Sequence, residues 1–181
     1  LYPGIRAACH MQGADVDREV DVQVAADQHT GGSVELSPLD IASMGRATPM
    51  VWFFQQTLDV ETLLSTLQTV LAAYPILCGR YDGKAPPAAV QLTNAGVKVH
   101  ISTASAPFAE AVAHLPHEPS HTSPSYFAKE THEPFLPAKA GIDPDPATAD
   151  VPLMSIKITK FPGGGTAIGQ LTQHGVCDAD C

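Results

Sequence analysis

Apolar side chains recur every three or four residues between positions 60 and 73, and this is the clearest pattern in the chain. The spacing places them on one face of a helix, at Val60, Leu63, Leu64, Leu67, Val70 and Leu71. Asp59 can cap the start of this helix. Tyr74-Pro75 should end it, because proline disfavours the helical conformation in the residue before it. We therefore expect an amphipathic helix over residues 60–73.

Apolar runs of strand length lie on both sides of this helix. They cover residues 20–24, 49–56, 89–92, 97–101, 153–160 and 166–172, and several of them alternate apolar with polar positions. The Asn-Ala-Gly sequence at 94–96 predicts a hairpin between the third and fourth runs, and the three glycines at 163–165 predict another between the last two. In the second run, we expect Trp52, Phe53 and Phe54 to lie in the core.

Two shorter helices and one long loop complete the predicted elements. Ser37 is a suitable N-cap for a helix over 39–44, with Pro38 at the first position, and a second short helix is expected over 108–115. Residues 116–150 are rich in proline and lack periodicity, which indicates a long surface excursion. Residues 1–18 should be irregular. The order of elements predicts a mixed α+β fold, with a mixed β-sheet flanked by helices.

Composition narrows the class of protein and excludes several partners. Of the 181 residues, 44% are hydrophobic and 16% are charged, as in a globular domain, and the net charge is −9. Without clustered cations, the chain should bind neither nucleic acid nor an anionic membrane surface. No run approaches the roughly 18 apolar residues that cross a bilayer. The four scattered cysteines fit reduced thiols, so we expect a cytoplasmic protein, cut from a longer polypeptide at both ends.

Four stretches, taken in order, resemble the N-terminal half of the plant-type BAHD acyltransferases, which belong to the coenzyme-A-dependent acyltransferase superfamily. They are residues 36–54, residues 74–81 with the sequence YPILCGRY, residues 152–169, and His174-Gly175-Val176-Cys177-Asp178. The last stretch matches the H-x-x-x-D motif of that family. Each stretch is weak evidence by itself, but four in this order are much more specific.

The resemblance implies a fold, a reaction and two site residues. Residues 19–181 would form the first domain of a chloramphenicol-acetyltransferase-like, two-domain acyltransferase, with the second domain absent from this chain. His174 would be the general base that assists transfer of an acyl group from a coenzyme A thioester to an alcohol or amine, a task that suits a neutral imidazole. Asp178 would be a structural partner that ties the motif loop to the second domain. No bound cofactor or metal is implied, and the chain alone should be inactive.

Two other functions fit parts of the sequence. A condensation-type enzyme of the same superfamily would act on carrier-bound acyl groups, but such enzymes usually carry a second histidine where this chain has Gln173. A non-catalytic remnant or binding module is the alternative from another class, since Ala179 stands where the family usually has a glycine after the motif aspartate. These residues specify neither the acyl donor nor the acceptor.

Other side-chain groups suggest metal or anion sites, but each has a simpler structural explanation. Cys177 and Cys181, with His174, could supply three zinc ligands, yet no second C-x-x-C accompanies them. Arg80 could contact an anion, although a structural role directly after Gly79 is the better prediction. Three further histidines fall in the proline-rich stretch, where we expect a solvated polar segment: His114, His117 and His121.

Overall fold

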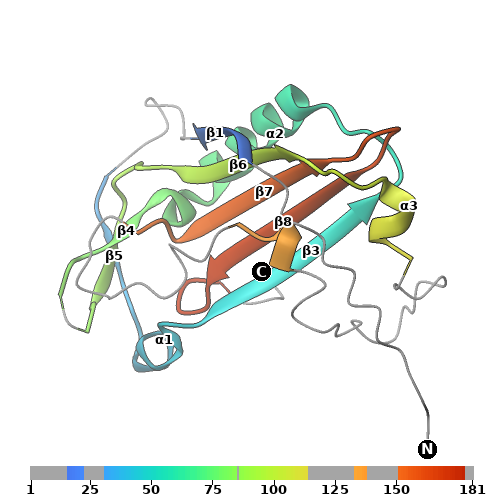
Figure 1. The fold of residues 1–181 in the computed structure, drawn as a ribbon. Coiled ribbons are helices and arrows are strands. Elements are labelled where there is room, and N and C mark those ends of the chain that lie inside the picture. The colour runs from blue at the N-terminus through green and yellow to red at the C-terminus, as the bar shows by residue number, and fades with distance from the viewer. Residues whose placement is uncertain (1–15, 23–30, 85, 114–132, 138–150, 178–181) are drawn as a thin grey trace, which may run out of the picture.

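The computed structural model describes residues 16–22, 31–84, 86–113, 133–137 and 151–177 (Figure 1). Its main feature is a five-stranded sheet in the order β1-β6-β7-β8-β3. The strands are β1 (Val16–Val22), β6 (Val97–Thr103), β7 (Met154–Lys160), β8 (Thr166–Gln173) and β3 (Ala47–Phe54). Strands β6 and β7 are parallel and the other neighbours are antiparallel, so the sheet is mixed as predicted. Strand β1 begins at Val16, within the segment expected to be irregular.

The predicted hairpin between residues 89–92 and 97–101 is wrong. Strand β5 (Ala89–Gln91) pairs with β2 (Ser33–Glu35) and β4 (Arg80–Tyr81) in a separate three-stranded sheet, whereas β6 belongs to the larger sheet. The turn residues Asn94 and Gly96 do adopt left-handed conformations, with φ of 53° and 89°. They redirect the chain from one sheet to the other, because the edges of β5 are already occupied by two partners.

Arg80 holds this turn, as the sequence predicted for a structural arginine. Its guanidinium is buried and donates hydrogen bonds to the carbonyl oxygens of Gly79 at 2.8 Å and Gly96 at 3.0 Å. The backbone N–H of Gly96 in turn donates to the carbonyl of Cys78 at 3.2 Å. These acceptors offset part of the cost of burying the charge.

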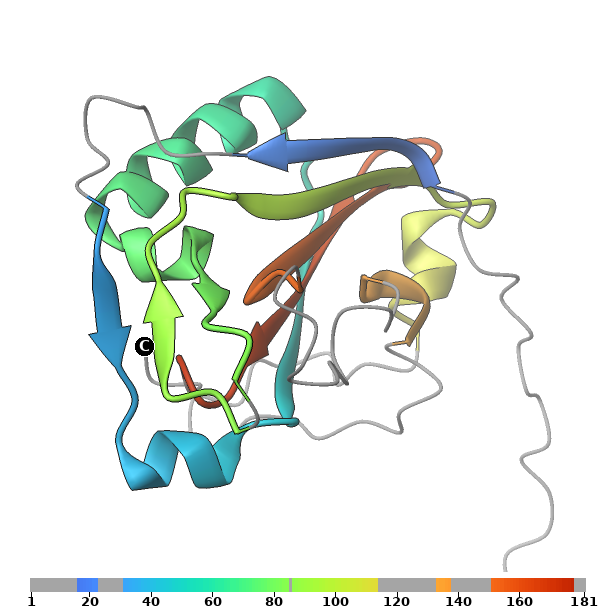
Figure 2. The same cartoon turned by 90° about the vertical axis from the view of Figure 1, so that its left-hand side faces the viewer.

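Helix α2 (Val60–Ala73) has the predicted bounds, and its Asp59 cap is confirmed because the carboxylate accepts from the Thr62 N–H at 2.8 Å. Figure 2 shows α2 on one face of the large sheet, with α3 (Phe108–Ala111) and the short helix η3 (Glu133–Phe135) on the other. The cluster beneath α2 contains Leu71, fully buried, and apolar residues of the first strands of the sheet: Val22, Val97, Val99, Ile101, Met154, Ile156 and Ile158.

Two smaller helices lie near the ends of the strands. Helix α1 (Pro38–Ser43) starts one residue before the predicted bounds, with Ser37 as its N-cap, and the 3-10 helix η2 (Pro75–Cys78) follows α2. Helix α3 ends at Ala111, earlier than predicted. Among the described helices, none has the length and apolar character that crossing a membrane requires.

Trp52 is 41% exposed, so the expectation that it lies in the core is wrong. It pairs with Ile168 on the sheet face that α2 covers, but the cluster under α2 is built from β1, β6 and β7. Because β3 is the edge strand, Trp52 lies beyond the reach of that helix. Its neighbour Phe53 faces the opposite side of the sheet and packs against the second cluster, as expected for a core residue.

The expectation of a surface excursion over residues 116–150 fails at 133–137, the one part of it that the structure describes. Phe135 is 1% exposed, and its ring lies 5.1 Å from that of Phe53 and 5.7 Å from that of Phe161. Lys157 donates a hydrogen bond from Nζ to the Pro134 carbonyl at 2.9 Å, and its burial lowers the pKa of that amine. An aromatic side chain and a buried amine thus fix this segment on the sheet.

Candidate functional site

The end of β8 places His174 at the margin of the large sheet. β8 is hydrogen-bonded to β7 on one side and to β3 on the other, so its position is fixed across its whole length. At its end, the Gln173 N–H donates to the Leu153 carbonyl at 2.9 Å, and the His174 N–H donates to the Arg46 carbonyl at 2.9 Å. The histidine backbone is therefore anchored to the chain on both sides of the strand.

A tight turn follows and leaves the imidazole outside. The N–H groups of Val176 and Cys177 both donate to the Gln173 carbonyl, at 3.0 and 3.2 Å. This bifurcated arrangement reverses the chain directly after β8. The side chain of His174 is exposed, while Gly175 beside it is buried. The imidazole is thus accessible from outside the protein, while its backbone is held by a hydrogen bond to Arg46.

The turn rests on a small apolar cluster. Tyr81, Val90 and Leu153 form its buried part, and Val176 packs against it. The hydroxyl of Tyr81 is buried and accepts or donates no hydrogen bond among the described residues. Burial, and secondarily the negative charge of Asp40, raise the pKa of this phenol to about 12. The cluster therefore supplies the motif turn with a rigid and largely apolar support.

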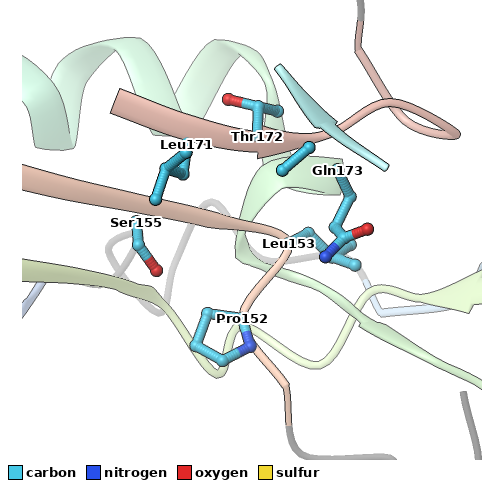
Figure 3. A pocket seen from close by; sticks show the side chains of 7 residues that line it. Pro152, Leu153, Ser155, Leu171, Thr172 and Gln173 are labelled. Atoms are coloured by element: carbon cyan, nitrogen blue, oxygen red, sulfur yellow. The ribbon is translucent and has the colours of Figure 1, made fainter. Parts of the chain in front are cut away.

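Gln173 faces away from solvent and does not line an open cavity. It is 2% exposed and borders a crevice with Leu153, Ser155 and Leu171, as Figure 3 shows. The crevice is too narrow to admit a water molecule. The residue before the motif histidine thus has a packing role in this part of the chain.

The remaining predicted site residues have different outcomes. Asp178, the second motif residue, and Cys181 lie outside the described residues. So do the three histidines at 114, 117 and 121. Within the described ranges, no group of three His, Cys, Asp or Glu side chains could hold a metal ion. The glycines at 163–165 form the predicted hairpin turn between β7 and β8, with φ of 81°, 117° and 100°.

Sequence reasoning missed two supporting residues, Arg46 and Gly175. Arg46 contributes only its backbone carbonyl, so no side-chain pattern could have identified it. Gly175 stands against helix α1, where a Cβ atom would lie 2.7 Å from the Asp40 carbonyl oxygen. A glycine in the turn after a strand does signal close backbone approach, and this signal was available in the motif itself.

The chain is similar to known proteins in sequence and in fold. A model of the Transferase family matches residues 18–181. Tryptamine hydroxycinnamoyltransferase 2 of Oryza sativa subsp. japonica is 30% identical over 151 residues, which are 82% of this chain and 31% of that protein. The chain therefore spans less than a third of the length of this relative.

Solved structures share the fold. Vinorine synthase superposes with a TM-score of 0.65 at 20% identity, over 89% of this chain and 38% of that one. The F. sporotrichioides TRI101 structure, complexed with coenzyme A and T-2, superposes with a TM-score of 0.52 at 16% identity, over 81% of this chain and 37% of that one. These likenesses agree with the expected fold of mixed sheet and flanking helices.

Proposed function

Because the chain belongs to the Transferase family, that of the BAHD acyltransferases, we propose that it is the N-terminal part of an enzyme that moves an acyl group from a coenzyme A thioester to an alcohol or amine. The observation that carries the proposal is the exposed imidazole of His174 at the anchored end of β8. His174 is the proposed general base.

The proposed reaction balances without a metal or a redox group. A ring nitrogen of His174 takes the proton from the acceptor hydroxyl or amine as that atom attacks the thioester carbonyl carbon. A carbon–oxygen or carbon–nitrogen bond forms, the carbon–sulfur bond breaks, and the coenzyme A thiolate leaves with the proton returned from the imidazolium. General base catalysis of this kind contributes roughly 10²- to 10⁴-fold to the rate.

Charge supports assigning part of the coenzyme A site to residues outside this chain. The chain carries 10 Lys and Arg against 19 Asp and Glu, so it offers little positive charge to the phosphates of coenzyme A. The chain also covers only 38% of the length of vinorine synthase. We therefore propose a second domain that completes the site and, through Asp178, ties down the motif loop. Residues 1–181 alone should show no turnover.

Replacement of His174 in the complete protein tests the base. Release of free coenzyme A thiol is followed with a panel of acyl-CoA donors and with alcohol and amine acceptors. His174→Ala should lower kcat by roughly 10²-fold or more, in line with the loss of a general base. Gln68→Ala, an exposed position on α2, is the matched control and should retain full activity. A His174→Ala enzyme within a few fold of the parent would remove the base assignment.

A further inference from the structure

The segment of residues 38–46, which comprises α1 and its connection to β3, touches the motif turn at two places. Its Arg46 carbonyl accepts the His174 N–H at 2.9 Å. One residue further along the turn, Gly175 lies against the Asp40 carbonyl and the Met44 side chain of the same segment. Figures 1 and 2 both show α1 beside the end of β8. Residues 38–46 thus contact the backbone of the proposed base His174 and of the residue that follows it.

Space, and not backbone conformation, requires glycine at 175. A Cβ atom there would lie 2.7 Å from the Asp40 carbonyl oxygen and 3.1 Å from Met44 Cγ. The oxygen belongs to the helix backbone and cannot rotate away as a side chain can. Gly175 is not among the glycines with positive φ, so an alanine would meet no conformational penalty there. Any effect of Gly175→Ala would come from separating α1 and the turn.

Local hydrogen bonds form a capping box at the start of α1, none of whose residues is buried. The Ser37 N–H donates to the Asp40 carboxylate at 2.8 Å, and the Asp40 N–H donates to Ser37 Oγ at 3.3 Å. Hydrogen bonds with the Ser37 side chain and backbone hold the pKa of Asp40 below its ordinary value, so this carboxylate is ionised near neutral pH. Leu36 and Met44, which flank the helix, pack against the same apolar cluster as Val176.

We propose that α1, seated on Gly175, is a positioning element for the proposed base His174. The inference rests on the proposed function and adds the means by which the chain fixes the imidazole in place. A shift of α1 by a few tenths of an ångström would move both the Arg46 carbonyl that accepts the His174 N–H and the Asp40 carbonyl that contacts Gly175. Displacement of a catalytic group by about 1 Å can cost about 10²-fold in rate.

Three variants of the complete protein test this positioning role. Gly175→Ala separates helix and turn, while Ser37→Ala loosens only the first turn of α1. Leu39→Ala is the matched control, since Leu39 lies on the same helix but is 76% exposed. Two quantities are measured: kcat and KM for acyl transfer, and the exchange rate of the His174 backbone amide with solvent deuterium.

Gly175→Ala should lower kcat about tenfold, with KM for both substrates within about threefold, because the base is misplaced while most binding contacts remain. The His174 amide should exchange faster, and Leu39→Ala should change neither quantity. Gly175→Ala activity within twofold of the parent, or an equal loss in Leu39→Ala, would overturn the proposal. If Gly175→Ala fails to fold, Ser37→Ala must show faster His174 exchange or the proposal falls. A parent without acyl transfer would refute the proposed function alone, since the exchange data still decide whether α1 holds the turn.

Discussion

Replacement of Phe135 by alanine should destabilise the protein strongly, although this residue lies in a stretch that reads as surface loop. The ring is 1% exposed and packs edge-on against Phe53, with centroids 5.1 Å apart and an interplanar angle of 80°. It also lies 5.7 Å from the ring of Phe161. The variant removes the central ring of this cluster and leaves a cavity between η3 and the sheet.

The size of the effect follows from burial. Truncation of a buried phenylalanine to alanine costs about 3–5 kcal/mol, which includes the lost transfer free energy and the cavity left behind. In a chain of this size, each kcal/mol lowers the melting temperature by about 2–4 °C, so we expect a drop of roughly 6–20 °C. The Lys157 bond to Pro134 at 2.9 Å favours the upper part of this range, because release of the segment would also leave a buried amine without its acceptor.

Thermal unfolding followed by circular dichroism measures the change. Tyr74→Ala is the matched control, because Tyr74 is also aromatic but is 61% exposed, and surface replacements usually stay within about 0.5 kcal/mol. If the two variants melt within 2 °C of each other, Phe135 does not anchor the segment at 133–137 and the description of this cluster is wrong.

Two further predictions concern the supports of the sheet and of the motif turn. Gly169→Ala would place a Cβ atom against the backbone carbonyl of Phe135, so we expect the free energy of unfolding in urea to fall by about 1–3 kcal/mol. This loss should be non-additive with that of Phe135→Ala, and an additive double variant would show that the two residues act separately. The raised pKa of Tyr81, about 12 against 10.0, means that the folded state keeps a proton which the unfolded chain releases, so stability should fall between pH 10 and pH 12. Tyr81→Phe should weaken this fall and leave stability at pH 7 unchanged or slightly higher, since it also removes a buried hydroxyl that has no hydrogen-bond partner in the described part of the chain. An unchanged pH profile would contradict the assignment.

Helix α2 and the hairpin of β7 and β8 could be predicted from the sequence because local patterns determine them. The apolar spacing, the Asp59 cap and the Tyr74-Pro75 stop define α2 within its own residues. The glycines at 163–165 supply the positive φ values of a tight turn, so the two flanking strands are brought together as an antiparallel pair. The motif histidine was also recognisable, because four stretches in order resemble one family.

Tertiary packing decided the features that local patterns did not. The sequence predicts that the chain turns at residues 94–96, and the structure agrees. Which strands this turn connects depends on the pairing of β5, because β2 and β4 already occupy both of its edges. Trp52 is apolar like its neighbour Phe53, but α2 does not reach Trp52 on one face of the edge strand, whereas Phe53 packs against the second cluster on the other face. Phe135 has no periodic neighbours, so its burial follows from the cavity that the sheet and α3 leave for it.

The sequence alone determined that this chain carries a histidine of the H-x-x-x-D type at the end of an apolar strand. Only the tertiary structure decided how that histidine is held, because its supports come from residues far away in the chain. The Arg46 carbonyl, the backbone of α1 at Asp40 and the apolar cluster around Tyr81 meet the motif turn through folding. Apart from Gly175, the backbone carbonyls and packing contacts that hold the His174 backbone carry no sequence signature.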